Sequence, residues 1–337
     1  MYATGRQPEA VPLVRRFARD DDTGMAPDIW QSRWTDIVDH LQPFLTEHSV
    51  EQLVDDLMAR QGPVTMAFIN AHVMNLIVSQ PLLSEWLRDA DLILRDGIGV
   101  SILLRILGVE PGLNLNGTDL IPRLVGRFND HPIALFGTAE PYLEKAAEAM
   151  VSRHGRTRAD ITTSSGFQDD AHYVDLCLSQ RPRLVVLGMG VPKQERIAAL
   201  LKRELTHDCL IVCGGAILDF YARRFRRAPE SMQRLHMEWM FRLALEPVRL
   251  FGRYVVGNPI FLFRAARLRM SSGTLSLQER HHWNDNAPAL PRGDLLIDEL
   301  AGRLSQASLA PPLATEIPGA AVSAPVPSPA RQRETSS

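Results

Sequence analysis

A carboxylate follows a short apolar segment in a position suited to acid–base chemistry. Asp96 comes after the predicted strand 92–94, and Gly97 loosens the turn that leads into the next predicted helix. Open parallel sheets bind ligands at the carboxyl ends of their strands. Asp96 is therefore a candidate general base or ribose ligand, although Asp-Gly is also a common turn.

Two glycine turns follow later strands. Gly188-Met189-Gly190 comes after the predicted strand 184–187, and Gly214-Gly215 comes after the predicted strand 210–212. Glycine lets the backbone come close to a ligand, so the three converging strand ends predict a nucleotide pocket. Lys193 occupies the third glycine position of the dinucleotide fingerprint G-x-G-x-x-G, and the sequence therefore does not support that motif.

Polar side chains also follow the first predicted strand, 64–69. Asn70 and His72 should lie on the same rim as the glycine turns, because parallel strands end at one edge of a sheet. A single histidine at this place is more often a helix-start residue than a catalyst. We predict that both side chains contact substrate.

One acidic motif could suggest a metal site. Asp89-Ala90-Asp91 has the Asp-x-Asp pattern that many sugar-nucleotide enzymes use for a divalent cation. It precedes the predicted strand 92–94, however, and so belongs to the sheet edge opposite Asp96. The acidic run Asp20-Asp21-Asp22 lies in a polar segment and is typical of a solvated surface. We predict no metal site and no cofactor.

The elements that must position these residues alternate along the chain. Strands are predicted over residues 64–69, 92–94, 133–136, 161–163, 184–187 and 210–212, and helices over 73–78, 99–107, 119–128, 141–154, 171–180 and 194–204. This alternation predicts a parallel, doubly wound sheet. The expected fold class is α/β: a Rossmann-like parallel sheet flanked by helices, with an arginine-rich helical appendage at its C-terminal end.

The chain divides into four predicted segments. Residues 1–46 are expected to form a polar N-terminal extension of low order, and residues 47–220 the Rossmann-like catalytic core. Residues 221–270 form the arginine-rich, membrane-facing appendage. Residues 271–337 are expected to be a largely disordered tail, because residues 310–337 are rich in proline, alanine and serine.

Composition is that of an ordinary globular protein. Of 337 residues, 45% are hydrophobic and 23% charged. The three cysteines, Cys177, Cys209 and Cys213, have no partners at zinc spacing and predict reduced core thiols in a cytosolic protein. Residues 1–22 lack the apolar stretch of a signal peptide. The interrupted apolar run 254–263 is shorter than the roughly 20 residues that span a bilayer.

The appendage carries an unusual charge. Residues 221–270 contain eleven arginines and three glutamates but no lysine or aspartate, a formal charge of +8 in a chain whose net charge is −2. Guanidinium pairs two-pronged with phosphate, and the interleaved aromatic residues suit a phosphate-rich surface that lies against lipid. Nucleic acid is a competing partner, but the slightly acidic chain and the glycine-turn pocket oppose it.

In this order and spacing, the residues resemble the WecG/TagA/CpsF family of glycosyltransferases (glycosyltransferase family 26). The resemblance runs over about residues 62–267. The marks are Asn70-Ala71-His72, Asp91-Leu92, Asp96-Gly97-Ile98-Gly99, Gly117-Thr118-Asp119-Leu120, Gly188-Met189-Gly190-Val191-Pro192-Lys193-Gln194-Glu195, Gly214-Gly215-Ala216, Asp219-Phe220, Arg227-Ala228-Pro229, Glu238-Trp239, Arg242, Glu246-Pro247, Arg249 and Arg253.

The resemblance implies an inverting hexosyltransferase of bacterial exopolysaccharide or cell-surface polysaccharide synthesis. Metal independence is expected because the appendage arginines can neutralise the departing diphosphate. Such an enzyme moves a sugar from a UDP-sugar to a polyprenyl-diphosphate-linked sugar. It is cytoplasmic and peripheral on the inner face of the plasma membrane, where it meets an anionic membrane surface and no nucleic acid. Homo-oligomer formation stays open, and a non-catalytic, membrane-docked scaffold is the alternative, which the carboxylate of Asp96 opposes.

By similarity, Asp96 is the base that deprotonates the acceptor hydroxyl, and the appendage arginines stabilise the leaving diphosphate. The implied substrate-binding residues are Asn70, His72, Gly97, Thr118, Asp119, Gly188, Gly190, Lys193, Gln194, Glu195, Gly214, Gly215, Arg227, Arg242, Arg249 and Arg253. A further group, Arg264, Arg267 and Arg269, is expected to meet lipid headgroups, each contributing about 1 kcal/mol.

The chain departs from the family pattern at two positions. Phe68 stands where many members have threonine, two residues before Asn70, and this difference bears on one expected substrate contact. Arg95 stands where many members have proline, directly before Asp96. We expect the second difference to alter donor preference.

Overall fold

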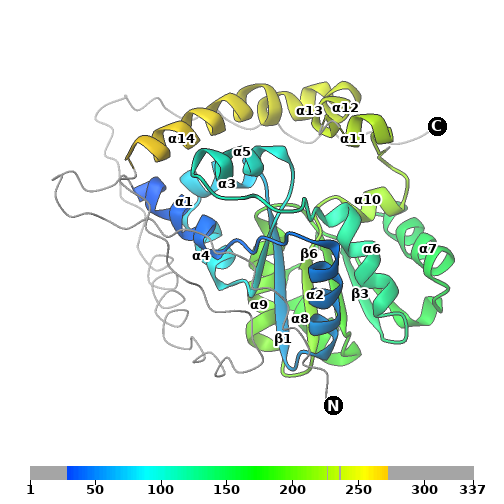
Figure 1. Ribbon diagram of the computed structural model, residues 1–337. Helices are drawn as coiled ribbons and strands as arrows, with labels where there is room; N and C mark the ends of the chain where they lie inside the picture. The colour runs from blue at the N-terminus through cyan, green and yellow to red at the C-terminus, as the bar shows by residue number, and fades with distance from the viewer. Residues whose placement is uncertain (1–28, 226, 235–236, 272–337) are drawn as a thin grey trace, which may run out of the picture. The chain divides into compact units, whose positions relative to one another are not determined.

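Six strands form one parallel sheet in the order β2-β1-β6-β5-β3-β4 (Figure 1). The computed structural model describes residues 29–225, 227–234 and 237–271. All six predicted strands are confirmed: β1 (Pro63–Ile69), β2 (Leu92–Arg95), β3 (Ile133–Gly137), β4 (Ile161–Ser164), β5 (Leu184–Gly188) and β6 (Cys209–Cys213).

Helices separate the strands and cover both faces of the sheet. The observed helices up to residue 221 are α1 (Ile29–His40), α2 (Glu47–Ala59), α3 (Ala71–Ser79), α4 (Pro81–Asp89), α5 (Ile98–Ile106), α6 (Gly117–Arg127), α7 (Tyr142–His154), the short η1 (Arg158–Asp160), α8 (Asp170–Gln180), α9 (Lys193–Glu204) and α10 (Ile217–Tyr221). Five of them, α1, α2, α4, η1 and α10, were not predicted. The predicted α/β class is confirmed.

Alternating side chains of each strand enter different cores. On one face, residues such as Met66, Val186 and Val212 pack with α2, α6, α7 and α10. On the other face, Ile69 packs with α1, α3, α4 and α5, whereas Val185 packs with α8 and α9. Burial on both faces explains why the strands appear in the sequence as continuous apolar runs.

Residues 29–46, which we expected in a polar extension, contain helix α1, and this helix is part of the core. Trp34 is 0% exposed, and its Nε1 donates to the carbonyl oxygen of Met74 at 2.8 Å. Its buried side chains recur at helical spacing, with charged residues on the exposed face as in an amphipathic helix; they are Trp30, Trp34, Ile37, Val38 and Leu41. Residues 1–28 and 272–337 lie outside the described residues, so the rest of the extension and the tail stay predictions.

The appendage is a chain of helices that crosses the carboxyl edge of the sheet (Figure 1). It comprises α11 (Glu230–Arg234), α12 (Glu238–Leu245), α13 (Pro247–Phe251), the π-helical turn η2 (Gly252–Val256) and α14 (Gly257–Ser271). The last helix, α14, is anchored in the core. Phe261 is 1% exposed, and its ring centroid lies 5.2 Å from that of Trp34. Asn75 of α3 donates to the carbonyl oxygen of Gly257 at 2.7 Å.

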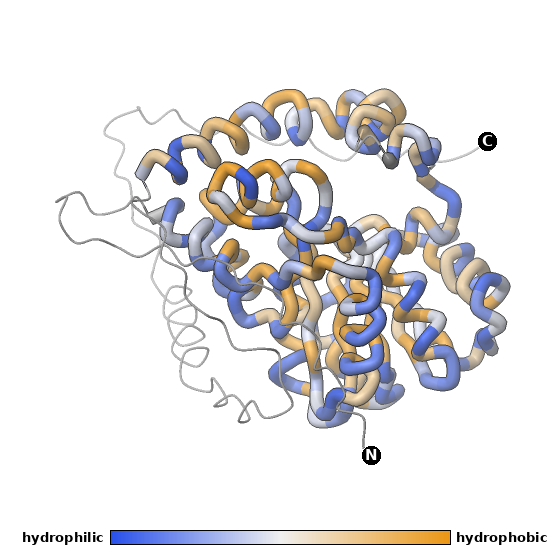
Figure 2. Tube along the Cα trace, viewed as in Figure 1, coloured by the Kyte–Doolittle hydropathy of each residue, from blue (hydrophilic) through white to orange (hydrophobic). Residues whose placement is uncertain are grey.

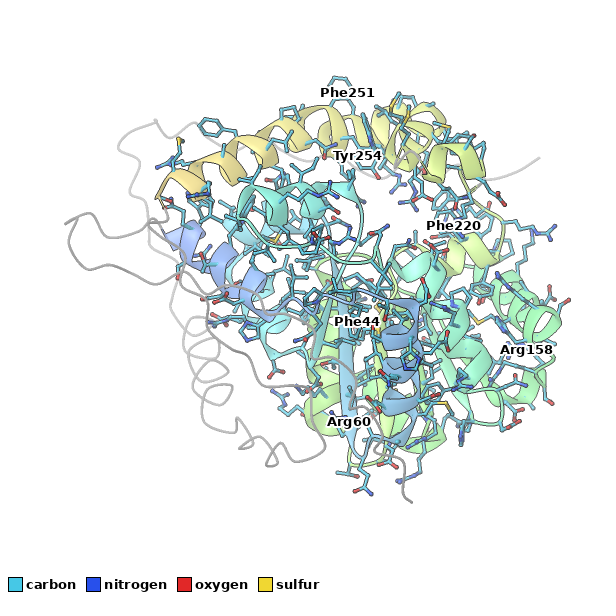
Figure 3. All side chains as sticks on the ribbon, in the orientation of Figure 1. Phe44, Arg60, Arg158, Phe220, Phe251 and Tyr254 are labelled. Atoms are coloured by element: carbon cyan, nitrogen blue, oxygen red, sulfur yellow. The ribbon has the colours of Figure 1, made fainter. Side chains whose placement is uncertain are left out.

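Figure 2 shows hydrophobic and hydrophilic positions mixed along the appendage, and several of the hydrophobic side chains are exposed. Val248 is 95% exposed, Phe251 54% and Phe263 67%, and Figure 3 shows Phe251 projecting away from the fold. We expected Arg264, Arg267 and Arg269 to face lipid. Arg264 instead points toward α3, where its guanidinium donates to Oδ1 of Asn75 at 2.8 Å. Arg267 and Arg269 are exposed.

The cysteines and the helices of the described residues bear on the expected compartment and membrane contact. Cys177, Cys209 and Cys213 are buried and unpaired, as predicted. Within the described part of the chain, none of the helices combines the length and the apolar character that crossing a membrane requires.

Candidate active site

A cavity of about 1660 Å³ lies between the carboxyl edge of the sheet and the appendage. Residues that end or follow all six strands line its floor: Asn70, Asp96, Thr138, Gly166, Gly188 and Gly214. The appendage forms the opposite wall, with Arg242, Arg249, Arg253, Tyr254 and Phe261. Figure 3 shows Tyr254 and Phe220 on the cavity side of their elements.

The structure brings most of the predicted site residues together here. Those that line the cavity are Asn70, His72, Asp96, Gly97, Thr118, Asp119, Gly188, Gly190, Gln194, Gly214, Gly215, Arg227, Arg242, Arg249 and Arg253. Lys193 and Glu195 do not line it. They come from the same motif as Gln194, but α9 directs their side chains elsewhere.

Asp96 is held at the cavity floor by the end of β1. Its backbone N–H donates to the carbonyl oxygen of Ile69 at 2.8 Å, and its Oδ2 accepts from Nδ2 of Asn70 at 3.2 Å. Among the side chains that the structure describes, Asn70 is the only donor to this carboxylate. Asp96 can therefore accept a proton or a hydrogen bond from a molecule in the cavity.

The orientation of Asn70 follows from its position as the N-cap of α3. Its Oδ1 accepts from the backbone N–H groups of His72 at 3.1 Å and Val73 at 3.2 Å. A capping side chain satisfies amides that have no partner within the helix. Because the oxygen is used by the cap, the Nδ2 group is directed toward Asp96.

Arg95 lies beneath the cavity and holds the turn that carries the candidate base. Its guanidinium donates to the carbonyl oxygens of Pro111 at 3.1 Å, Gly112 at 2.8 Å and Gly97 at 3.3 Å, and to Oδ1 of Asn114 at 3.3 Å. The same Oδ1 accepts from the N–H of Gly97 at 2.8 Å. Burial lowers the pKa of Arg95 to about 10, so it remains a cation at neutral pH. Arg95 thus links the turn at Gly97 to the loop that follows α5, and its side chain does not line the cavity.

Gln194 connects the two glycine turns. Its Oε1 accepts from the N–H of Gly190 at 3.3 Å and from that of Gly215 at 2.9 Å. Its Nε2 donates to Oε1 of Glu195 at 2.8 Å. The side chain that the resemblance assigns to substrate is therefore already engaged in holding both turns in register.

Glu195 is a buried carboxyl below this connection. It is 2% exposed, and its Oε2 has no hydrogen-bond partner among the described residues. Burial raises the pKa of Glu195 to about 7, because the charged form loses its hydration. Its contact with Gln194 makes Glu195 a support of the glycine turns.

Two of the appendage arginines are paired with carboxylates inside the cavity. Arg227 lies 2.5 Å from Oδ1 of Asp119. Arg249 makes a two-pronged pair with Glu246, at 2.5 and 2.8 Å. These cations face the cavity but share their hydrogen bonds with the protein.

The other two arginines are differently placed. Arg242 lies over the ring of Phe220, with 4.8 Å to the centroid, and Arg253 over that of Tyr254, with 5.3 Å. Within the described residues, neither forms an ion pair with a carboxylate, and Nε of Arg253 is buried without a hydrogen-bond partner. Arg242 and Arg253 are consequently the cations most available to an anionic ligand.

His72 is a neutral group of this wall. Burial, together with the positive charge of Arg253, lowers the pKa of His72 to about 4. The imidazole is therefore uncharged at neutral pH and can donate one hydrogen bond and accept another. It adds no positive charge to the arginine cluster.

Among the cavity residues that were missed as site residues is a cluster of three, Thr138, Asp219 and Arg224. Oγ1 of Thr138 donates to Oδ1 of Asp219 at 2.7 Å, and Arg224 lies 3.1 Å from the same oxygen. Thr138 follows β3 and has a positive φ of 42°. The family motif Asp219-Phe220 includes one residue of this cluster. The left-handed backbone conformation of Thr138 could not be recognised from the sequence.

The Asp-x-Asp motif lies at the opposite edge, as expected. Oδ2 of Asp91 accepts from the N–H and the Oγ1 of Thr65, at 2.8 and 2.9 Å, and Lys202 lies 3.0 Å from its other oxygen. The Nζ of Lys202 is also 3.9 Å from Asp89. These contacts explain the motif as a structural link between β1, β2 and α9. In the described ranges, no group of three or more His, Cys, Asp or Glu side chains is arranged to hold a metal ion.

Comparison with known proteins gives a family match over most of this fold. The Glycosyl transferase WecG/TagA/CpsF family matches residues 39–274, which is more than half of the chain. The match includes the whole sheet, the cavity floor and the appendage helices.

Three similar proteins carry the name N-acetylglucosaminyldiphosphoundecaprenol N-acetyl-beta-D-mannosaminyltransferase. The protein of Bacillus spizizenii is 26% identical over 175 residues, which cover 51% of this chain and 67% of the relative. That of Bacillus subtilis is 23% identical over 220 residues, covering 65% and 81%. That of Staphylococcus aureus is 24% identical over 204 residues, covering 59% and 78%.

Glu195→Gln should change how stability depends on pH. The carboxyl keeps its proton to about pH 7 in the folded chain, whereas the unfolded chain loses it near 4.5. The folded state therefore binds more protons than the unfolded state in this window, and the free energy of unfolding falls as pH rises. We expect wild type to lose on the order of 3 kcal/mol relative to the variant between about pH 4.5 and 7, measured by urea unfolding.

The matched control is Glu148→Gln, because Glu148 is an exposed glutamate on α7. This control should leave the pH profile of wild type unchanged. Parallel profiles for wild type and Glu195→Gln would show that the buried carboxyl does not titrate in this range.

Proposed function

Because this chain belongs to the WecG/TagA/CpsF family of glycosyltransferases, we propose that it moves a hexose-type sugar from a UDP-sugar to a polyprenyl-diphosphate-linked sugar, with inversion at the anomeric carbon. The observation that carries the proposal is the cavity in which Asp96 faces the appendage arginines. The names of the relatives favour an N-acetylated amino sugar as the group transferred and a lipid-linked N-acetylglucosamine as the acceptor.

The proposed reaction is a direct displacement in which Asp96 acts as the base. The carboxylate accepts the proton of the acceptor hydroxyl while the oxygen forms a bond to the anomeric carbon. The bond from that carbon to the β-phosphate oxygen breaks, and UDP leaves with the electron pair. A positioned base typically contributes about 10²–10⁴-fold to such a step. The amide of Asn70 keeps the carboxylate oriented toward the cavity.

The departing UDP needs positive charge on the other side of the anomeric carbon. Arg242 and Arg253 supply it in the proposed reaction, since neither is paired with a carboxylate within the described residues. Preorganised charge at a developing anion is often the largest catalytic contribution. Arg227 and Arg249 would join them after leaving Asp119 and Glu246.

The acceptor lipid should reach the cavity from a membrane surface. Helices α12 to α14 line the cavity on one side and expose Val248, Phe251 and Phe263 on another. An apolar face beside arginines fits an anionic bilayer, where apolar side chains enter the interface and cations meet headgroups. We propose a peripheral enzyme on the inner face of the plasma membrane.

Asp96→Asn should reduce turnover by at least about 10²-fold, because the amide cannot accept the hydroxyl proton. Affinity for UDP should stay nearly unchanged, since the substitution preserves shape. Sugar transfer to a short-chain lipid-diphosphate-sugar, together with calorimetric titration of UDP, measures both. Asp175→Asn, at an exposed carboxylate on α8, is the control and should behave as wild type. Undiminished transfer by Asp96→Asn would remove Asp96 as the base.

Activity should persist in EDTA, because the proposed counter-charge for the diphosphate comes from arginine side chains. The purified protein is assayed with excess chelator, and then after addition of Mn²⁺ or Mg²⁺. Equal rates are expected under all three conditions. A loss of activity in EDTA that either metal restores would contradict metal-independent transfer.

The double substitution Val248→Ser and Phe251→Ser should weaken membrane binding by about tenfold or more, since both apolar side chains are exposed and away from the cavity. Co-sedimentation with vesicles of phosphatidylglycerol and phosphatidylcholine measures the change. Leu178→Ser, at an exposed leucine on α8, is the control. Equal sedimentation of the double variant and wild type would mean that the membrane contacts another surface.

A further inference from the structure

A second cavity, of about 560 Å³, lies at helices α6, α7 and α10. Helix α10 packs against both of the other helices (Figure 1). The residues that line this cavity and not the first are Pro122, Arg123, Arg153, His154, Tyr221 and Arg223. Its volume is that of a typical small-molecule site, and the proposed transfer reaction makes no use of it.

The lining of the second cavity has a surplus of positive charge. Its arginines are Arg123, Arg153, Arg223 and Arg227. Asp119 is the only carboxylate among the described residues of the lining. His154 adds no charge at neutral pH, because burial and the neighbouring arginines lower the pKa of its imidazole. The cavity therefore favours an anion.

Two of these arginines are already paired with carboxylates. Nη2 of Arg123 lies 2.8 Å from Glu47 and 3.0 Å from Glu51. Arg227 pairs with Asp119, and this pair lines both cavities. Neither guanidinium is the first choice for a ligand of the second cavity.

The other two arginines are available to a ligand. Within the described residues, neither Arg153 nor Arg223 forms an ion pair with a carboxylate, and both are exposed. The guanidinium of Arg153 lies over the ring of the buried Tyr221, with 5.7 Å to the centroid. The hydroxyl of Tyr221 lies 3.0 Å from Nε2 of His154. A buried, hydrogen-bonded ring thus supports one of the two free cations.

The chemistry of the lining indicates the class of ligand. A guanidinium matches phosphate with two parallel N–H donors, and this geometry favours phosphate over other anions. The rings of Phe220 and Phe225, with centroids 6.2 Å apart, also line the cavity and offer apolar contact to an organic group. We propose that the second cavity binds an organic phosphate, with its phosphate group held by Arg153 and Arg223.

Arg153→Gln combined with Arg223→Gln should weaken phosphate binding by about tenfold or more, because two charged donors are removed. Calorimetric titration with inorganic phosphate measures the affinity, first without UDP and then with UDP in excess to fill the first cavity. UDP affinity should equal that of wild type, since neither arginine lines the first cavity. Thermal melting verifies that the variant is folded.

The matched control is Arg181→Gln combined with Arg203→Gln. It removes the same charge at two exposed arginines that line neither cavity. Its phosphate affinity should equal that of wild type. Equal weakening in the two double variants would overturn the proposal, because net charge alone would then explain the binding.

Sedimentation with vesicles of phosphatidic acid and phosphatidylcholine distinguishes two sources of the phosphate. Weaker sedimentation of Arg153→Gln/Arg223→Gln, together with its lost phosphate affinity, would support a lipid headgroup. Unchanged sedimentation with lost phosphate affinity would support a soluble organic phosphate.

The titrations also separate this site from the proposed function. Phosphate affinity that is equal in wild type and Arg153→Gln/Arg223→Gln would overturn the second site. So would a wild-type protein that binds UDP but no phosphate once UDP fills the first cavity. A wild-type protein that binds neither UDP nor UDP-sugars would overturn the transfer reaction, and the titration without UDP would then decide the second site alone.

Discussion

The cavity depends on the burial of Phe261 against the core. This side chain of α14 enters the same apolar cluster as Trp34 of α1, and Asn75 of α3 fastens the helix at Gly257 and Arg264. Without these contacts the appendage would have no fixed position over the strand ends. The distance between Asp96 and the arginines is therefore set by hydrophobic packing that lies outside the site.

Polar side chains under the cavity serve the backbone more than the ligand. Arg95 and Asn114 hold the turn of Gly97, Gln194 holds two glycine turns, and Lys193 holds the loop after β4. Turns at strand ends leave amides and carbonyls that need partners. Meeting that need with side chains stiffens the loops before any ligand arrives, and this preorganisation is what a binding site requires.

The sheet and the position of Asp96 could be predicted because both follow from local pattern. Apolar runs bounded by glycine and aspartate indicate strands, and parallel strands bring their carboxyl ends to one edge. The orientation of single side chains could not be predicted in this way. Lys193, Gln194 and Glu195 are consecutive, yet only Gln194 lines the cavity, because the turns of α9 direct neighbours to different sides. Helix α1 was missed although its buried positions fall at helical spacing, because the composition of residues 1–46 is polar and predicted an extension.

The carboxylates that accompany the arginines affect how a reaction cycle can end. Arg249 pairs with Glu246, and Arg227 pairs with Asp119. Any diphosphate that binds these arginines must displace an internal anion, so the net affinity is the difference between two ion pairs. In the proposed reaction, the spent nucleotide would leave as the carboxylates recapture the guanidinium groups. The glutamate and the aspartate would then compete with product for the arginines.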